Sequence, residues 1–322
     1  MTAPSPADTR RVAVIGGGQN CEHDVSLASA TAVAAALEQV GHDTVRLTID
    51  PGGVWHDARQ HPIGLAIAIE VLRTCDVVFP VLHGPRGEDG TIAALCELTG
   101  IPYVGSGVRA GALAMDKWAT KLVAGAMNIA TAPATLLTAT TAPSYAFSHP
   151  VVVKPAAAGS SHGVTLVGTA PELEAALTGA FALGDHVLVE DVVVGREIDL
   201  AVLGRPDGSH VVAPALEINV EGLFSLADKY DGSADFRVPA ELAETDRTAL
   251  EDAAVVMYDA LGCRGLARVD FFLTAEGPVL NEVNTMPGFT EQSQAPKMFA
   301  AAGMSYPELV DLLVRDAVGV HG

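Results

Sequence analysis

Three oxygen-bearing side chains near the end of the chain have the types and spacing of ligands for a divalent cation. The stretch LNEVNTMPGFT, residues 280–290, places Glu282 and Asn284 two residues apart. Residues i and i+2 of a β-strand share a face, so these two side chains, and Leu280 with them, are expected on one face. Asp270 lies in the preceding apolar stretch ARVDFFL, which a short Ala-Glu-Gly turn connects to the first. The two stretches are therefore predicted to pair as a hairpin.

Such a hairpin would let Asp270, Glu282 and Asn284 converge on one sheet face. Mg²⁺ is a hard cation that binds few protein oxygens and completes its octahedron with water and phosphate oxygens. A solvated sheet face would also tolerate these three residue types. The flanking residues are strongly apolar, however, and acids in such surroundings need partners. The pattern therefore favours a magnesium site, and magnesium in turn suggests a nucleotide.

A second stretch, KPAAAGSSHGV, offers what a phosphate group binds. Lys154 ends a predicted strand, and Gly159, Ser160, Ser161 and Gly163 follow in a loop rich in N–H and hydroxyl donors. The spacing G-x-x-x-x-G-K-[ST] is absent, so this is not a P-loop. On its own such a loop is weak evidence for phosphate binding.

The net charge of −20 argues against nucleic acid and anionic membranes as partners. Any anion that binds here needs positive charge placed locally, which makes the lysines informative. The chain of 322 residues has only five, namely Lys117, Lys121, Lys154, Lys229 and Lys297.

Other features of the composition indicate a soluble cytoplasmic protein. The four cysteines are far apart and form no C-x-x-C pair, so neither a zinc site nor a redox motif is expected. The N-terminal stretch has no apolar segment typical of a signal peptide. No apolar run approaches the roughly 20 residues that span a bilayer.

The elements that must position these residues begin with alternating strands and helices. This alternation is typical of a doubly wound parallel α/β unit, in which ligands gather at the C-terminal ends of the strands. We predict strands over 12–18, 43–49 and 75–84, and helices over 26–41 and 88–100, the latter with an acidic first turn.

The rest of the chain has a different pattern of predicted strands and helices, and it is predicted to form two α+β units. We predict an N-terminal domain over 1–112, a central domain over 113–196 and a C-terminal domain over 197–322. The segment 219–237 is polar and rich in glycine, and we expect it to act as a lid that becomes ordered when nucleotide binds. Within these units we predict helices over 112–128, 245–261 and 306–318, a hairpin over 149–167 and two strands around Gly195.

Nine short motifs, in one order over nearly the whole chain, resemble the D-alanine–D-alanine ligase family of the ATP-grasp fold. The resemblance implies ATP bound between two antiparallel sheets, two Mg²⁺ ions for which Mn²⁺ could substitute, and a homodimer. It also implies that two D-alanines are joined through an acylphosphate for peptidoglycan precursor synthesis. The motifs are EHDVSLASA, HGPRGEDG, IPYVGSGV, MDKWATK, VVVKPAAAGSS, LVEDVVVGRE, ADKY, RGLARVDFF and NEVNTMPGFT.

The resemblance assigns a nucleotide role to several of these residues. Glu190 would lie at the adenine edge and Glu197 at the ribose, while Glu282 would bridge the two magnesium ions. The implied ATP-binding residues are Lys117, Lys154, Ser160, Ser161, Glu190, Asp191, Val193, Glu197 and Lys229, and the implied metal ligands are Asp270, Glu282 and Asn284.

The resemblance also implies two amino-acid subsites. Glu22 would hold the ammonium of the first D-alanine and form a hydrogen-bonded triad with Ser160 and Tyr230. Arg268 and the backbone N–H of Gly288 would stabilise the developing oxyanion. The implied catalytic residues are Glu22, Ser160, Tyr230, Arg268 and Gly288, and the implied substrate-binding residues are Glu22, Ser26, His83, Arg268, Ser293 and Gln294.

Gln294 departs from the family pattern, in which an apolar residue often follows the serine that binds the second D-alanine. The second substrate is therefore open between D-alanine and another D-amino acid, and so is a role in a secondary pathway or in self-resistance. Another carboxylate–amine ligase of this fold, or a non-catalytic nucleotide sensor, are further alternatives. The run VAVIGGGQN also suggests a dinucleotide-binding oxidoreductase, but it lacks the spacing G-x-G-x-x-G.

Overall fold

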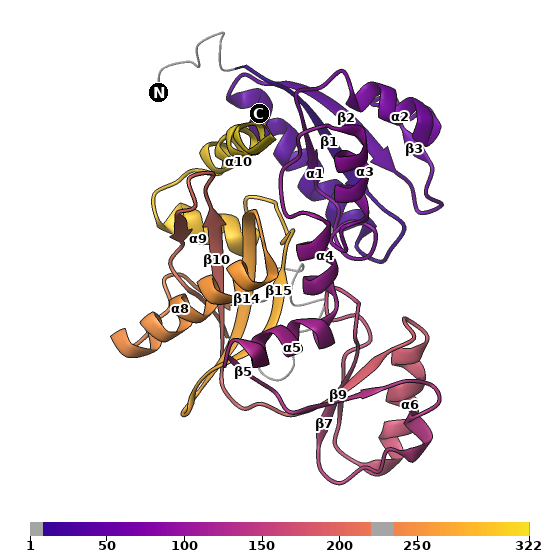
Figure 1. Ribbon diagram of the computed structural model, residues 1–322, viewed down its shortest axis with the longest axis vertical. Coiled ribbons are helices and arrows are strands. Elements are labelled where there is room, and N and C mark those ends of the chain that lie inside the picture. The colour runs from indigo at the N-terminus through magenta and orange to yellow at the C-terminus, as the bar shows by residue number, and fades with distance from the viewer. Residues whose placement is uncertain (1–8, 220–234, 322) are drawn as a thin grey trace.

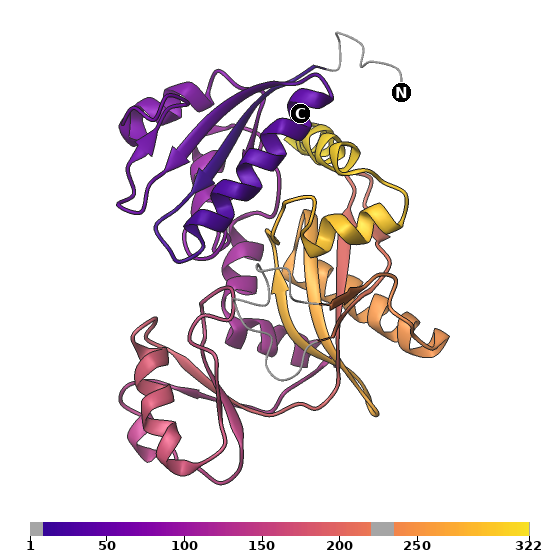
Figure 2. The ribbon, with the colours of Figure 1, turned by 180° about the vertical axis from the view of Figure 1, so that it is seen from behind.

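The computed structural model describes residues 9–219 and 235–321, which fold around three β-sheets. Figures 1 and 2 show the N-terminal sheet at one end, a small sheet at the other end and the largest sheet between them. The N-terminal sheet has the order β3-β2-β1-β4, with β1 parallel to both of its neighbours and β3 antiparallel to β2. Its strands are β1 (Arg11–Gly17), β2 (Asp43–Ile49), β3 (Trp55–His56) and β4 (Val77–Pro80).

Helices cover both faces of this sheet, as the doubly wound prediction requires. One face packs on α1 (His23–Gln39) and α10 (Tyr306–His321), and the other on α2 (Gly64–Leu72) and α3 (Thr91–Thr99). The helix α2 is not among the predicted elements. The predicted acidic first turn of α3 is wrong, because the helix begins at Thr91, after its acidic residues.

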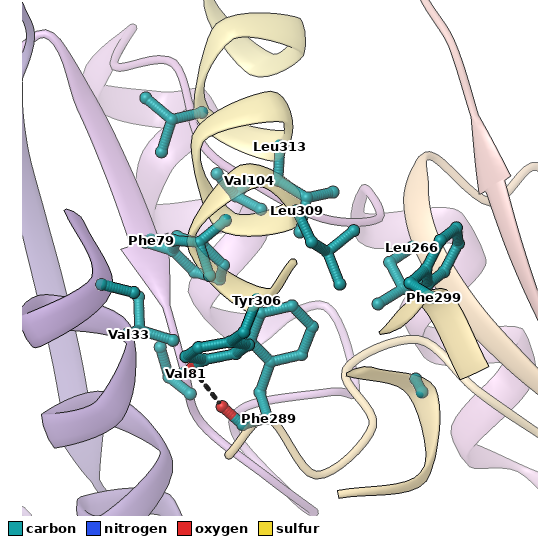
Figure 3. Packing of buried hydrophobic residues seen from close by; sticks show 14 of the residues in the cluster. Val33, Phe79, Val81, Val104, Leu266, Phe289, Phe299, Tyr306, Leu309 and Leu313 are labelled. Carbon is teal, nitrogen blue, oxygen red and sulfur yellow. Dashed lines mark hydrogen bonds between the residues drawn. The ribbon is translucent and has the colours of Figure 1, made fainter. Parts of the chain in front are cut away.

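The last helix, α10, joins the C-terminal part of the chain to the N-terminal sheet. Its buried side chains Leu309 and Leu313 pack in one cluster with Val33 of α1 and Phe79 of β4 (Figure 3). Phe289, from the loop that follows the predicted hairpin of Asp270 and Glu282, lies in the same cluster. Its carbonyl oxygen accepts a hydrogen bond from the Tyr306 hydroxyl at 2.7 Å. A loop of the candidate site is thus anchored in this core.

The small sheet is antiparallel and contains the predicted hairpin over 149–167. Its order is β6-β9-β7-β8, and α6 (Ala170–Phe181) buries Leu173 and Leu177 against it. The hairpin is confirmed, because β7 and β8 pair directly. The strands are β6 (Ala134–Leu137), β7 (Val151–Pro155), β8 (Thr165–Val167) and β9 (Val187–Asp191), and a short 3₁₀ helix, η1, spans Ala142–Ser144.

The largest sheet has the order β13-β12-β10-β14-β15-β5, with β11 paired to β10, and is antiparallel except between β15 and β5. The helix α8 (Glu244–Leu261) covers one face, and α9 (Gln294–Ala301) packs near β10. The strands are β5 (Ala130–Thr131), β10 (Arg196–Gly204), β11 (His210–Val212), β12 (Leu216–Asn219), β13 (Asp235–Arg237), β14 (Gly265–Thr274) and β15 (Gly277–Asn284).

The single helix predicted over 112–128 is wrong. The structure has two helices, α4 (Val108–Met115) and α5 (Lys117–Ala126), because Asp116 adopts an extended conformation between them. Its carboxylate accepts hydrogen bonds from the first backbone N–H groups of α5 and so begins a new helix there.

Sheet membership bears on the predicted domain ranges, which stay a prediction. The small sheet, from β6 to β9, lies within 113–196. The elements α5 and β5 also lie in that range but pack against the largest sheet. Most of the predicted lid, 219–237, lies outside the described residues. No helix in the described part of the chain is long and apolar enough to cross a membrane.

Candidate active site

The three predicted metal ligands lie together on the β14–β15 hairpin, whose pairing is confirmed. Asp270 pairs directly with Glu282, and Arg268 pairs with Asn284 at the next site-facing position. The amide nitrogen of Asn284 donates to Oδ2 of Asp270 at 3.0 Å. The amide oxygen of Asn284 is therefore directed away from that carboxylate.

The strand register shifts once in this hairpin. Phe271 pairs with Leu280, although the preceding residue, Asp270, pairs with Glu282, so Asn281 is an extra residue in β15. Leu280 is consequently buried with Phe271 in the core that α8 covers. The prediction that Leu280 shares the face of Glu282 is wrong, because alternation holds only while the pairing is regular.

The chemistry of these side chains fits a divalent cation. Two carboxylates and one amide oxygen are ligands that Mg²⁺ prefers. Among residues 9–219 and 235–321, no group of three or more His, Cys, Asp or Glu is arranged to hold a metal. A cation at this hairpin would therefore depend on Asn284 and on phosphate oxygens. Lys117 already compensates some of the acidic charge, with Nζ 3.2 Å from Oε2 of Glu282.

Arg268 lies buried between two carboxylates. Its Nε and one terminal nitrogen donate to the two oxygens of Asp270, both at 2.7 Å, and its Nε is 3.4 Å from Oδ2 of Asp199. Burial lowers the pKa of Arg268, but the charges of Asp270 and Asp199 outweigh that effect and hold the pKa above its ordinary value. The guanidinium is therefore a fixed positive charge beside the predicted metal ligands.

A cavity of about 190 Å³ lies between the small sheet and the largest sheet. Its walls include the side chain of Lys117 at the start of α5 and the end of β7 at Lys154. Most of the predicted nucleotide-binding residues meet here. The predicted nucleotide-binding residues that line the cavity are Lys117, Lys154, Ser161, Glu190, Asp191, Val193 and Glu197. The predicted metal ligand Glu282 lines it as well.

Glu190 is held in this cavity by two buried lysines. Lys154 Nζ lies 2.8 Å from Oε2 of Glu190, and Lys121 Nζ lies 3.0 Å from Oε1. Lys121 also donates to the carbonyl of Ala132 at 2.9 Å. Burial lowers the pKa of Lys121 below its ordinary value, although the charge of Glu190 opposes this shift. Two positive charges thus surround one acid in a site that is shielded from water.

Two predicted positions beside the cavity have fixed backbone contacts. The backbone N–H of Asp191 donates to the carbonyl of Pro133 at 2.9 Å, so this N–H is already engaged and is not available to a ligand. Ser160 and Ser161 have φ angles of 49° and 56°, in the left-handed region that non-glycine residues rarely adopt. The loop they form is therefore held in a specific conformation.

Glu22 connects this loop to the N-terminal sheet. Glu22 directly precedes α1 and is buried, and the Ser160 hydroxyl donates to its Oε1. Its Oε2 is buried and has no hydrogen-bond partner among the described residues. A buried carboxylate oxygen of this kind fits an ammonium group.

Two glycines allow the unpartnered oxygen to come close to the backbone. A Cβ atom on Gly84 would lie 2.3 Å from Oε2 of Glu22, and one on Gly159 would lie 2.4 Å away. Gly84 also has a φ of +67°, which favours glycine. Both loops around Glu22 therefore depend on glycine at these positions.

His83 bridges the N-terminal sheet and the loop that carries Gly288. Its Nδ1 is 3.0 Å from the carbonyl oxygen of Met286, and its Nε2 is 3.2 Å from the Ser29 hydroxyl. Burial lowers the pKa of His83, so the ring is neutral, with Nδ1 donating and Nε2 accepting. Both ring nitrogens are engaged, which places His83 as a support of the loop.

Glu88 is a residue that the sequence did not single out. Its Oε2 accepts from the Gly84 backbone N–H at 2.7 Å, and its Oε1 accepts from the Met286 N–H at 3.1 Å. Removal from water and the nearby charges of Glu22 and Glu282 raise the pKa of Glu88 to about 8. The carboxyl group therefore holds a proton at neutral pH while it joins the two loops.

Ser26, predicted to bind substrate, lies inside the N-terminal domain. Its hydroxyl accepts from the Gly17 N–H at 2.9 Å and donates to the carbonyl of Val81. The side chain is fully buried. These contacts connect the ends of β1 and β4, and they leave the substrate role of Ser26 without structural support.

The predicted second-substrate residues lie where α9 begins. The Ser293 hydroxyl accepts from the Thr290 N–H at 3.0 Å, and a Cβ on Gly288 would lie 3.3 Å from its Oγ. Gln294 donates from Nε2 to Oδ2 of Asp199 at 2.9 Å. The structure thus brings Ser293 close to the Gly288 loop and ties Gln294 to the acid that contacts Arg268.

Two predicted residues, Lys229 and Tyr230, lie outside the described residues. Sequence reasoning also missed four residues that the structure places at the site, and two of them carried a recognisable signal. Lys121 lies one helical turn after Lys117, and Asp199 is an acid inside an apolar strand. Ser29 and Glu88 had no such signal. The missed residues are Ser29, Glu88, Lys121 and Asp199.

Comparison with known proteins identifies the family of the chain. The family model described as D-ala D-ala ligase N-terminus matches residues 11–106, and the one described as D-ala D-ala ligase C-terminus matches residues 130–315. The chain is 39% identical to the D-alanine–D-alanine ligase of Mycobacterium bovis, and the match covers 100% of both chains.

Solved structures show the same similarity. The D-alanine–D-alanine ligase from Bacillus anthracis, complexed with ATP, is 28% identical with a TM-score of 0.80, and the match covers 97% of this chain and 99% of that one. The VanG D-Ala:D-Ser ligase from Enterococcus faecalis is 31% identical with a TM-score of 0.81, and the match covers 98% of this chain and 100% of that one. The chain belongs to the D-alanine–D-alanine ligase family.

Proposed function

We propose that this protein joins two D-alanine molecules into D-alanyl-D-alanine, with conversion of ATP to ADP and phosphate, for peptidoglycan precursor synthesis. One observation carries the proposal. The loop with Ser160 and Ser161 contacts the buried carboxylate of Glu22 on one side and lines the cavity between the two sheets on the other. An ammonium-bearing substrate at Glu22 would therefore lie next to a nucleotide in the cavity.

The charges in the cavity support ATP as the nucleotide. Lys117 and Lys154 are positively charged donors in an otherwise acidic protein. In the structure, Lys117 contacts Glu282 and Lys154 contacts Glu190. We infer that they turn to the phosphates when ATP binds, while Glu190 meets the adenine edge and Glu197 the ribose. Lys229, outside the described residues, is proposed to assist them.

The metal-ligand hairpin is proposed to hold Mg²⁺, two ions in all, through Asp270, Glu282 and Asn284. When bound, Mg²⁺ supplies positive charge that offsets the phosphate oxygens and orients them. The protein's own contribution is the placement of these oxygen donors on neighbouring strands, with Lys117 beside Glu282.

The first proposed step forms the acylphosphate. A carboxylate oxygen of the first D-alanine attacks the γ-phosphorus, the bond to the β-phosphate oxygen breaks, and ADP leaves. Glu22 holds the ammonium group of this substrate, and Arg268 holds its carboxyl group. Both residues are buried and already fixed by neighbours, so they position the reactants without reorganisation.

The second proposed step forms the amide bond. The amine of the second D-alanine attacks the acyl carbon, loses a proton, and phosphate leaves. Arg268 and the Gly288 N–H stabilise the negative charge that develops on the carbonyl oxygen. Ser293, whose hydroxyl lies against Gly288, is proposed to bind the carboxylate of this second substrate.

A second candidate function is ligation of D-alanine to a different D-amino acid. The observation that favours it is Gln294, a polar residue directly after Ser293 whose amide is oriented by Asp199. A polar group there could accept a hydrogen bond from a second substrate such as D-serine. A role in a secondary pathway or in self-resistance would be compatible with either product.

The test is an assay of the purified protein with ATP, Mg²⁺ and D-alanine, in which phosphate and dipeptide are measured together. Equal amounts of phosphate and D-alanyl-D-alanine are expected, and added chelator should stop both. Parallel reactions with D-serine or D-lactate added would show mixed products if the second candidate holds. A lack of phosphate release with D-alanine alone would reject the proposed function.

We also propose that the protein acts as a cytoplasmic homodimer, on the basis of the family resemblance. The measurement is the molar mass in solution by light scattering. A mass equal to one chain at assay concentration would reject the dimer.

A further inference from the structure

Asp199 is a fully buried acid to which the proposed reaction gives no role. It lies on β10 and pairs with Asp270 on β14, which in turn pairs with Glu282 on β15. Three acids therefore form a row across three neighbouring strands. Like charges side by side on a sheet destabilise it unless other groups compensate them. The partners of Asp199 should then explain why an acid lies there.

The first partner of Asp199 is Arg268, which has two acidic neighbours. Asp270 makes the shorter contacts, but it also accepts from Asn284 and belongs to the proposed metal site. Asp199 lies 3.4 Å from the Arg268 Nε and has no part in that site. Asp199 can therefore keep the Arg268 guanidinium in place even when Asp270 binds another group.

The second partner of Asp199 is Gln294. Its amide nitrogen donates to Oδ2 of Asp199, the same atom that faces Arg268. A carboxylate can only accept, so the Gln294 amide oxygen is turned away from Asp199. Gln294 is the first residue of α9 and directly follows Ser293. One carboxylate oxygen thus connects the arginine of the first subsite to the start of the helix at the second.

We propose that Asp199 is a positioning residue that aligns the two amino-acid subsites, through Arg268 for the first substrate and through Gln294 for the second. This inference rests on the proposed function, since it uses the two subsites of that reaction. The nucleotide cavity is lined by other residues, so the affinity for ATP is not expected to depend on Asp199.

The experiment compares three full-length variants with the wild-type enzyme. Asp199→Asn keeps the shape and removes the charge, and Gln294→Leu removes only the second contact. Glu217→Gln is the matched control, because Glu217 is also a buried acid of the largest sheet that pairs with an arginine, Arg196, at 2.7 Å. The KM for D-alanine at each subsite, the KM for ATP and the melting temperature are measured for each.

Asp199→Asn is expected to raise the KM for D-alanine at both subsites by about ten-fold, the cost of a lost hydrogen bond to a charged group, with the KM for ATP changed less than about two-fold. Gln294→Leu should raise the KM for D-alanine at the second subsite only. Glu217→Gln should change the KM at neither subsite. Equal losses of melting temperature in Asp199→Asn and Glu217→Gln with unchanged KM values would overturn the proposal, and so would an effect on one subsite only. Failure of the proposed function would appear in the wild-type enzyme instead, as no dipeptide.

Discussion

The Nδ1 atom of His83 lies 3.0 Å from the carbonyl oxygen of Met286, a residue 203 positions further along the chain. His83 follows β4 of the N-terminal sheet, whereas Met286 begins the loop after β15 of the largest sheet. The same imidazole reaches Ser29 on α1, whose hydroxyl oxygen accepts from the Phe289 N–H at 3.2 Å. The loop with Gly288 is thus held at both ends by the N-terminal domain.

The first prediction concerns this support. Ser29→Ala removes the hydroxyl that joins His83 to the Phe289 N–H, so the Gly288 N–H should be held less firmly at the developing oxyanion. We expect kcat to fall about ten-fold with little change in the KM for ATP. The measurement is steady-state kinetics, and Thr31→Ala is the control, since Thr31 lies on the same helix and, among the described residues, its hydroxyl donates only to the carbonyl of Leu27. An unchanged kcat in Ser29→Ala would show that the loop needs no such support.

The second prediction concerns the space around Glu22. Gly159→Ala places a Cβ atom 2.4 Å from Oε2 of Glu22, so the carboxylate must move away from the position proposed for the substrate ammonium. The KM for the first D-alanine should rise by about ten-fold or more, while the melting temperature changes little. Gly179→Ala is the control, because a Cβ at that helical position meets no atom of the described residues within 4 Å. If the two variants have equal KM values, Glu22 is not the ammonium site.

Local sequence patterns predicted the elements in which the contacting residues are close together in the chain. The β14–β15 hairpin followed from alternation and a short turn, and the pairing of Asp270 with Glu282 came with it. The extra residue at Asn281 could not be predicted, because a bulge depends on how both strands pack and not on the composition of either. Leu280 was misplaced for that reason.

Contacts between distant segments were outside the reach of these patterns. Ser29 lies in a predicted helix, but its partners His83 and Phe289 are brought to it only by tertiary packing. Asp199 could have been found, since an acid in an apolar strand was the same signal that identified Asp270. Its pairing with Asp270, however, required knowledge that β10 lies beside β14.

The third prediction concerns the buried lysine beside Glu190. If Lys154 turns to the phosphates of ATP, Lys121 is the cation that still neutralises Glu190. Lys121→Met should therefore raise the KM for ATP about ten-fold, because a buried acid without its ion-pair partner is unfavourable. The KM for D-alanine should change less. Lys297→Met, which removes a lysine that lies over the Phe236 ring, is the control. A similar rise in both KM values would indicate general loss of structure instead.

The fourth prediction concerns pH. The pKa of Glu88 is raised from 4.5 to about 8, so in this interval the folded protein holds a proton that the unfolded chain releases. The free energy of unfolding should therefore decrease as the pH rises through that window, by the linkage between proton binding and folding. Glu88→Gln has no proton to lose and should show a smaller decrease. The measurement is urea unfolding at about pH 5 and about pH 8, at constant ionic strength.

This test compares how steeply the free energy of unfolding decreases with pH in each variant, and not its value at a single pH. Glu88 accepts from two backbone N–H groups, and a glutamine offers only one acceptor oxygen, so Glu88→Gln should be less stable than the wild type at about pH 5. Glu174→Gln, at an exposed position of α6, is the control for removing an acid, and its slope should match the wild type. If Glu88→Gln keeps the wild-type slope, another group binds the proton, and Glu88 then joins the Gly84 and Met286 loops as a carboxylate.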